Sequence, residues 1–481
     1  RDGYVLTNFP YLNNGPKDLI GNSGKGKEYA YRSYFGRVMY SYADRYLFQA
    51  NIRHDGSSRF AKKHRWGTFP SFSAGWVLSE ENFMKNLNWE WLSFLKIRAT
   101  WGALGNERIG DFPYMSTIAF GNTIFYQNNG IYFDQTASQQ KYAIENVTWE
   151  KTESTDIGLD ISFLNNRLRV NGDYYWKNTK DMLLAMAIPD FLGFSDPDVN
   201  AGKMSTKGYE LNVSWNDHIG DFSYGIAINF SDFTSKMGDL QGTQFLGDKV
   251  KMEGSEFNEW YGYVSDGLFL TEEDLKNSPK INDKNTQLGD IKYKDISGPD
   301  GVPDGKISPE YDRVLLGSSL PHFLYGGNIN LGYKNFDLSL AFQGVGKQNA
   351  RLAREMVEPF RNNYGNFPAI IDGNYWSPYN TDEQNAVAKY PRLTHVNKSS
   401  NYAMSDYWLF NGGYFRLKNI TLGYTFPKEW MNAIGIKGAR IYASASDLFC
   451  LSKYPKGWDP EMGVSEYPIT TSILLGVSVN F

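Results

Sequence analysis

Apolar and polar residues alternate at every second position in many short stretches of this chain. At the carboxyl end, Ile473 and Leu475 fall on one side of an extended backbone, whereas Gly476 and Ser478 fall on the other. This period of two is the signature of a β-strand with one apolar face. The stretch ends on an aromatic residue, Phe481.

The same alternation predicts about thirteen antiparallel strands. We place them at residues 32–42, 46–55, 69–78, 93–102, 157–163, 168–176, 209–215, 222–230, 325–333, 336–342, 413–426, 437–447 and 471–481. The apolar phase changes within residues 413–426, which predicts a β-bulge near Lys418. An odd number of strands leaves the first and the last parallel, so we expect that this segment does not close on itself and that upstream sequence completes the wall.

Short turns and long connections alternate along the chain. The long ones are residues 104–152, 178–204, 231–322, 346–411 and 449–469. This rhythm is typical of a transmembrane β-barrel in a bacterial outer membrane, with short periplasmic turns and long extracellular loops. We therefore predict an all-β, transmembrane antiparallel barrel, in which residues 1–30 belong to an external loop. A soluble sandwich is the alternative, and it would leave the long connections as unexplained insertions.

Composition agrees with a membrane-embedded wall. Aromatic residues make up 16% of the chain, and no stretch has the roughly 18 consecutive apolar residues of a membrane helix. The net charge is −4 without a basic stripe, so nucleic acid is not an expected partner. The single cysteine, Cys450, excludes a disulfide within the chain and is expected to be an ordinary packed residue. Because the chain begins at Arg1 without a leader, we expect it to be part of a longer polypeptide.

Several short motifs, in order, resemble the C-terminal half of the SusC/RagA family of TonB-dependent outer-membrane transporters. They are residues 55–60 (DGSSRF), 66–71 (WGTFPS), 74–76 (AGW), 95–98 (LKIR), 105–106 (GN), 149–152 (WEKT), 157–160 (IGLD), 390–393 (YPRL), 414–424 (YFRLKNITLGY) and 458–461 (WDPE). Phe481 also resembles the terminal signal of barrels that the outer-membrane assembly machinery folds.

The resemblance implies a 22-stranded barrel with about nine strands upstream. It also implies a plug domain and a TonB-contacting segment that this sequence does not contain. Family members work with a SusD-like surface lipoprotein that closes the outer mouth as a lid. Their ligands are mostly oligosaccharides, with peptides for some members.

An acidic segment within residues 295–312 is a candidate calcium loop. Its candidate ligands are Asp295, Ser297, Asp300, Asp304, Lys306 and Asp312. Calcium prefers several oxygen ligands on a glycine-containing loop, and any such ion would stiffen the loop rather than act in catalysis. The segment resembles a loop common at this place in the family, but with an insertion before Asp304. The alternative is a solvated turn held by its own side-chain hydrogen bonds. No cofactor is required.

Aromatic residues in the long loops are candidates for stacking against sugar rings. They are Trp260, Tyr261, Trp376, Tyr379, Tyr407 and Trp408, with Tyr126 and Tyr132 earlier in the chain. The alternative for each is packing of the loop on itself or against the lid. Aromatic residues in the strands, Tyr174, Trp176 and Trp215, are expected to form the membrane-interface girdle instead.

Enzymatic chemistry has little support in the sequence. The five histidines are His54, His64, His218, His322 and His395, which have neither zinc-ligand spacing nor a cysteine companion. A barrel hydrolase with a lipid-facing Ser and His is the remaining enzyme hypothesis, but His64 and His218 fall in or near connections. We therefore expect no enzyme.

The expected function is energised import of oligosaccharides through a wetted lumen. Residues expected to face that lumen are Asp160, Arg167, Arg169, Asp173, Asn212, Asn328, Asn330 and Gln343. Leu211 and Ile329 are expected to face lipid. The alternatives are a peptide importer of the same family and a passive porin or adhesin barrel.

Overall fold

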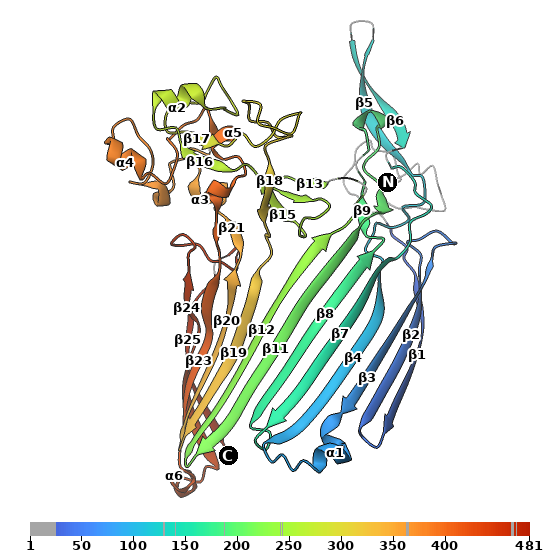
Figure 1. Ribbon diagram of the computed structural model, residues 1–481, viewed down its shortest axis with the longest axis vertical. Helices are drawn as coiled ribbons and strands as arrows, with labels where there is room; N and C mark the ends of the chain where they lie inside the picture. The colour runs from blue at the N-terminus through green and yellow to red at the C-terminus, as the bar shows by residue number, and fades with distance from the viewer. Residues whose placement is uncertain are drawn as a thin grey trace.

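The computed structural model describes residues 26–127, 130–139, 141–186, 188–240, 242, 244–361, 365–462, 466–467 and 469–481. Its main element is one antiparallel sheet of 13 strands, which Figure 1 shows as a tall curved wall. In spatial order the strands are β1 (Tyr31–Tyr42), β2 (Tyr46–Ser57), β3 (Trp66–Val77), β4 (Leu92–Asn106), β7 (Glu150–Phe163), β8 (Leu168–Lys180), β11 (Lys203–Ile219), β12 (Phe222–Met237), β19 (His322–Tyr333), β20 (Phe336–Lys347), β23 (Tyr414–Thr425), β24 (Gly438–Ser452) and β25 (Ser472–Asn480). The thirteen predicted strands are confirmed, each paired with its neighbour in the chain order.

The predicted bulge is also confirmed. The pairing of β23 with β24 shifts register between Leu417 and Asn419, and the pairing of β20 with β23 shifts between Ala341 and Phe342. The bulge lets Phe415 and Ile420 share one face of the sheet despite their opposite parity in the sequence.

The short turns and the long loops lie at opposite ends of the wall. The turn end carries tight connections such as Leu164, Asn165 and Asn166, whose φ angles are +52°, +57° and +65°. Two short helices, α1 (Asn82–Lys85) and α6 (Lys428–Ala433), also lie there, and α6 is close to the C-terminus (Figure 1). The predicted external position of residues 1–30 falls mostly outside the described residues.

The two faces of the wall differ in chemistry. One face, here called the apolar face, carries exposed residues such as Ile157, Tyr174 and Leu211. The opposite face, here called the polar face, carries the ion pairs of Arg98 and Arg440. Successive side chains of a strand point to opposite faces, so the alternation in the sequence produces both surfaces. No helix in the described part of the chain has the length and hydropathy needed to span a membrane.

The two longest loops fold together at the other end of the wall. Residues 238–321 and 348–413, here called the outer domain, share one buried core in which Tyr263, Ile291 and Tyr293 of the first loop pack with Val357 and Trp408 of the second. The outer domain contains β13 (Gln244–Leu246), β14 (Lys249–Lys251), β15 (Glu259–Gly262), β16 (Ser265–Leu268), β17 (Ile291–Tyr293), β18 (Val314–Gly317), β21 (Asn349–Arg351), β22 (Leu409–Asn411), α2 (Glu272–Asn277), α3 (Arg354–Val357), α4 (Asp382–Ala386) and α5 (Lys398–Asn401).

Two other loops add strands above the wall. β5 (Ile118–Gln127) and β6 (Gly130–Gln139) form a hairpin within the predicted connection 104–152, and it projects beyond the rest of the molecule in Figure 1. β9 (Leu183–Ala185) and β10 (Asp198–Asn200) form a small hairpin within the connection 178–204. The sequence did not predict either hairpin, because their residues lack a clean alternation of apolar and polar positions.

Candidate functional site

The outer domain holds the six aromatic residues that the sequence singled out. Trp408 is only 1% exposed, and its ring stacks on Tyr402 at 5.1 Å between centroids. Its Nε1 donates to the Asn401 carbonyl at 2.9 Å. We therefore correct the interpretation of Trp408: it is a core residue of the outer domain, because both its ring and its polar atom are occupied within the loops.

Three of the other aromatic candidates are also held by the loops. The Tyr407 hydroxyl donates to the Lys389 carbonyl at 2.8 Å, and burial raises the pKa of its phenol. Trp376 lies against Gly289, where an added Cβ would come within 2.3 Å of the indole ring. The Trp260 Nε1 donates to the Asn349 carbonyl at 2.6 Å, and the Lys249 ammonium lies 4.6 Å from its ring. These rings are partly exposed, and each has a structural role that accounts for its position.

Tyr379 differs from the rest because its side chain is 95% exposed. Tyr126 and Tyr132, on the β5–β6 hairpin, are 73% and 52% exposed. Tyr261 is partly buried, and the Arg313 guanidinium lies 4.9 Å from its ring. Among the aromatic candidates, the most exposed faces therefore lie on Tyr379 and on the hairpin, on separate loops.

A buried polar network joins the two halves of the outer domain. The Asp290 carboxylate is fully buried and accepts from Arg392 Nε at 2.7 Å, from Asn397 Nδ2 at 2.8 Å and from Asn401 Nδ2 at 2.9 Å. It also accepts the backbone N–H of Gln287 at 2.9 Å. Asp290 comes from the first loop and its side-chain donors from the second. Each side-chain hydrogen bond to Asp290 therefore ties the two loops together.

The acidic loop does not assemble a set of ion ligands. The Asp312 carboxylate is fully buried and accepts the backbone N–H groups of Ile296, Ser297 and Ser308 at 2.7–3.2 Å. Asp295 accepts the N–H of Gly305. The remaining candidates take little part: Asp304 accepts from the N–H of Lys306, and Asp300 is exposed.

These hydrogen bonds account for the conformation of the acidic loop without an ion. Within the residues that the structure describes, no group of three or more His, Cys, Asp or Glu side chains has the arrangement of a metal site. One oxygen, Asp295 Oδ1, is buried without a hydrogen-bond partner. Calcium takes six to eight oxygen ligands, and this one oxygen does not supply them. Calcium binding at the acidic loop stays a prediction.

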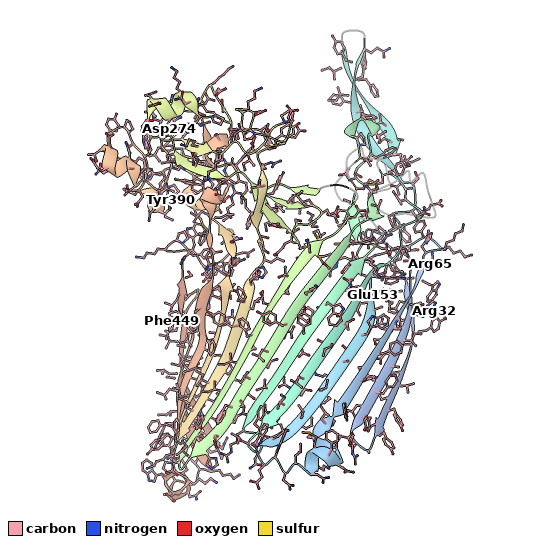
Figure 2. The ribbon with its side chains drawn as sticks, viewed as in Figure 1. Arg32, Arg65, Glu153, Asp274, Tyr390 and Phe449 are labelled. Carbon is pink, nitrogen blue, oxygen red and sulfur yellow. The ribbon has the colours of Figure 1, made fainter. Side chains whose placement is uncertain are left out.

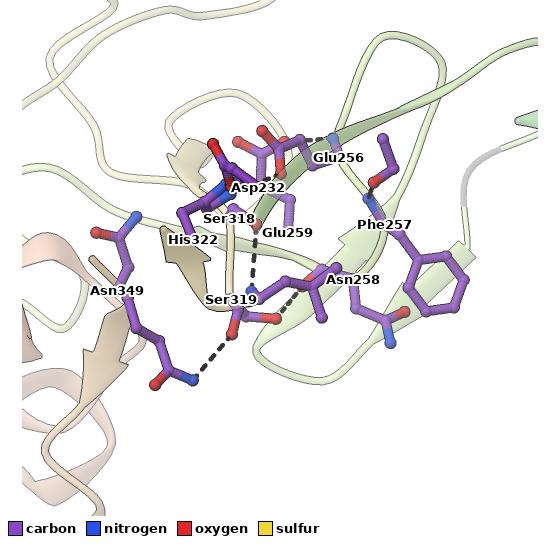
Figure 3. Close-up of polar contacts among 12 residues, drawn as sticks. Asp232, Glu256, Phe257, Asn258, Glu259, Ser318, Ser319, His322 and Asn349 are labelled. Atoms are coloured by element: carbon purple, nitrogen blue, oxygen red, sulfur yellow. Dashed lines mark hydrogen bonds and ion pairs between the residues drawn. The ribbon is translucent and has the colours of Figure 1, made fainter. Parts of the chain in front are cut away.

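A second polar cluster joins the outer domain to the wall. The His322 Nδ1 lies 2.8 Å from Asp232 Oδ1, and its Nε2 lies 3.5 Å from Glu256 Oε2 (Figure 3). Phe323, the next residue, has a φ angle of +56°, a backbone conformation that is costly for a bulky side chain. This strained turn and the cluster beside it lie at the point where the chain enters β19, so they set the direction in which the outer domain leaves the wall.

The polar face of the wall carries charged clusters. Arg98 lies 2.7 Å from Asp173 and 3.3 Å from Asp160, on strands β4, β7 and β8. Arg416 is 3% exposed and contacts Asp459 and Glu461 at 2.5 Å each. Asp459 and Glu461 belong to the last loop, so Arg416 holds this loop against the polar face.

The predicted orientation of the strand residues is confirmed. Asp160 and Asp173 lie on the polar face with Arg98, and strand register places Asn212, Asn328, Asn330, Arg169 and Gln343 on the same face. Arg167 precedes β8 and pairs with Asp217 at 3.0 Å. Tyr174, Trp176 and Trp215 lie on the apolar face with Leu211 and Ile329.

The sequence did not predict the polar clusters around Asp290, His322 and Arg416. Some members of these clusters do lie in the short motifs. Arg416 lies in motif 414–424 and Arg392 in motif 390–393, both of which resemble the family. Asp459 and Glu461 lie in motif 458–461. Asp290, Asp232 and His322 carried no local signal, because their side-chain partners lie 66 to 111 residues away in the chain.

With this architecture established, the chain belongs to the family of TonB-dependent receptor-like β-barrels, whose profile matches residues 2–448. It is 32% identical over 468 residues to the TonB-dependent receptor SusC of Bacteroides thetaiotaomicron, covering 93% of this chain and 43% of the relative. It is 31% identical over 453 residues to the TonB-dependent receptor P3 of Formosa agariphila, covering 89% of this chain and 42% of the relative. The chain thus spans less than half the length of these relatives.

Solved structures show the same fold. The RagAB peptide transporter superposes with a TM-score of 0.76 at 23% identity, over 100% of this chain and 51% of the solved one. The chain is therefore part of a bacterial outer-membrane β-barrel, as the alternation predicted. Its apolar face is the lipid-facing side, its polar face lines the lumen, and the long loops are extracellular. The soluble sandwich is excluded, and membership of a receptor family agrees with the expectation that the chain is not an enzyme.

Proposed function

We propose that this chain forms much of the barrel wall and the extracellular ligand platform of a TonB-dependent importer of oligosaccharides. The observation that carries the proposal is the polar face of the wall. Its Arg98 cluster and its row of asparagines provide charged and amide groups along a path between the outer domain and the turn end. Such groups keep a lumen wetted and offer hydrogen bonds to sugar hydroxyl groups.

In this proposal the outer domain is a rigid platform rather than a set of mobile loops. Its core and the Asp290 network fix the two longest loops against each other. A SusD-like lipoprotein would close over this platform as a lid, and the ligand would lie between them. Tyr379 and the β5–β6 hairpin would offer the exposed aromatic faces to the ligand.

Force transmitted by TonB would then displace a plug supplied by the rest of the polypeptide. The membership of the chain in the TonB-dependent receptor family and its 32% identity to SusC support this energised mechanism over a passive porin. Peptide import is the competing proposal, because loop aromatic residues suit both kinds of ligand.

The test is uptake by cells that express the full-length transporter with its lipoprotein partner. Labelled oligosaccharides and labelled peptides would be compared, each with and without a protonophore that removes the energy source of TonB. Oligosaccharide uptake that the protonophore abolishes would support the proposal. Uptake that is insensitive to the protonophore would indicate a porin. Energised uptake of peptides alone would indicate that the ligand is a peptide and not an oligosaccharide.

A further inference from the structure

Three lysines lie side by side at the extracellular end of the lipid-facing side of the wall. Strand register pairs Lys180 of β8 with Lys151 of β7 on one side and with Lys203 of β11 on the other. All three are exposed. They share the parity of Ile157, Tyr174 and Tyr209 on their strands, without an intervening bulge, and this parity places them on the apolar face.

Two more lysines extend this row toward the membrane. Lys236 of β12 is paired with Ser205, and Lys207 of β11 is paired with Trp176 and with Thr234. We call Lys151, Lys180, Lys203, Lys207 and Lys236 the lysine patch. It spans four adjacent strands on one face, and its upper edge in Figure 1 lies where β7, β8, β11 and β12 meet the loops.

Few acidic groups of the protein balance the lysine patch. Glu153, labelled in Figure 2, lies 2.9 Å from the Lys180 ammonium. Asp232 shares the face but hydrogen-bonds to His322. The other four lysines of the patch make no ion pair with any residue that the structure describes. Like charges directly opposite each other on neighbouring strands are destabilising, so this arrangement has a cost that an external anion would offset.

A band of aromatic rings lies directly below the patch on the same face. Tyr174 and Trp176 have ring centroids 6.1 Å apart, and Tyr209 lies 6.0 Å from Phe230. Aromatic bands of this kind mark the level of the lipid headgroups, with acyl chains beneath them. The ammonium groups therefore extend into the layer where the phosphates of outer-leaflet lipids lie, and exposed lysines at a membrane surface attract anionic lipids.

We propose that the lysine patch binds the phosphate-bearing headgroup of an anionic lipid of the outer leaflet, with the acyl chains of that lipid against Tyr174, Trp176 and Tyr209. Charge complementarity and the adjoining aromatic band select a lipid over a soluble anion, because a soluble anion would gain nothing from the apolar surface. The inference concerns the lipid-facing side of the wall and does not depend on which ligand the lumen carries.

The test uses the full-length transporter, purified in an uncharged detergent. The variant K151Q/K180Q/K203Q removes the upper row of the patch. The matched control K62Q/K63Q/K276Q removes the same charge from exposed loop lysines. The variant K151R/K180R/K203R keeps the charge of the upper row. Native mass spectrometry would count bound molecules of bis-phosphorylated lipid A, of phosphatidylcholine and of inorganic phosphate.

We expect the wild type, the control and the arginine variant to retain lipid A, and the glutamine patch variant to bind it at least tenfold more weakly. Phosphatidylcholine and inorganic phosphate should bind none of the four proteins appreciably. Only protein that shows the heat-modifiable electrophoretic shift of a folded barrel would be compared, and K203Q alone would serve if the triple variant does not assemble. Equal lipid A binding by wild type and patch variant would overturn the proposal, and so would equally tight binding of inorganic phosphate.

Discussion

Replacing Asp290 with Asn should loosen the outer domain while leaving the barrel wall intact. The substitution keeps the volume of the side chain but removes its charge and turns one acceptor oxygen into a donor. Arg392 then loses its ionic partner, and at least two of the donors that now contact Asp290 face another N–H group, whichever oxygen becomes the amide nitrogen. Removing one partner of a buried ion pair costs about 3–5 kcal/mol. Because each 1.4 kcal/mol is a factor of ten, local opening should become roughly a hundred to a few thousand times more frequent.

Hydrogen exchange on the full-length transporter measures this opening directly. Amides that depend on the network, such as Ile291 N–H bonded to Asn401 Oδ1, should exchange faster by that factor. Amides of β7 and β8 should not change, because the wall has its own ladder of hydrogen bonds. The control is Asp283→Asn, whose side chain is 85% exposed and 3.9 Å from Lys280, so its ion pair contributes at most about 1 kcal/mol.

A double variant separates loss of the ion pair from loss of packing. Asp290→Asn with Arg392→Met removes both charges and should recover part of the lost protection, because an apolar replacement leaves no unpaired charge. Two results would show that the buried network does not hold the two loops together. One is equal exchange rates in Asp290→Asn and Asp283→Asn. The other is a loss of protection in the double variant that exceeds the sum of the losses in Asp290→Asn and Arg392→Met.

Further predictions concern the wall, the last loop and the ligand platform. Leu211→Lys should impair barrel assembly by about 1–3 kcal/mol, because Leu211 faces lipid two residues beyond the aromatic band at Tyr209, whereas Asn212→Lys on the polar face should be tolerated; equal loss of both from the outer membrane would contradict the assignment of faces. Arg416→Met should lower the free energy that holds the last loop against the polar face by about 3–5 kcal/mol, so protease should cleave this loop in intact cells. Arg440→Met breaks a half-exposed pair with Asp337 and should not have this effect. Resistance to protease in both variants would refute the role of Arg416. Tyr379→Ala should leave the thermal stability within about 0.5 kcal/mol of the wild type and weaken ligand binding by two- to tenfold, or about 0.5–1.5 kcal/mol, as measured by calorimetry; unchanged affinity would remove Tyr379 from the platform.

The wall was predictable because short stretches of sequence specify its strands and turns. A strand with one apolar and one polar face needs only alternation, and a tight turn needs only a few residues such as Asn165 and Asn166. Even the bulge at Lys418 left a trace, since the apolar phase changes where the register shifts. The strand number and facing therefore followed from residues no more than about twenty positions apart, and the strand order followed the succession of strands along the chain, even where β12 pairs with β19 across a long loop.

The outer domain was not predictable in the same way. Its core is made by short elements such as β17 and α5, which are too brief to show a period, and its contacts join residues about a hundred positions apart. Aromatic residues in the outer domain can pack in its core or form a binding surface, and the sequence does not distinguish the two roles. Trp408 and Tyr379 are the two extremes, at 1% and 95% exposure.

The short motifs acquire a common physical role once the contacts are known. Trp149 packs against Phe60 and Phe69 with ring centroids 5.3 Å from each, and its Nε1 donates to the Arg65 carbonyl, so three motifs hold the loop after β4 against the loop after β2. Arg416 does the same for the last loop through Asp459.

Each of these contacts lies where a long loop meets the top of the wall. Ordering a loop along its whole length costs conformational entropy at every residue. Fixing only the base of the loop orders a few side chains and still restricts the positions that the remaining residues can reach. The motifs therefore position the loops. By this argument, variation in ligand should arise in the loop residues beyond these anchors, such as Tyr379 and the β5–β6 hairpin, and exchanging those segments between relatives should transfer ligand preference without loss of barrel assembly.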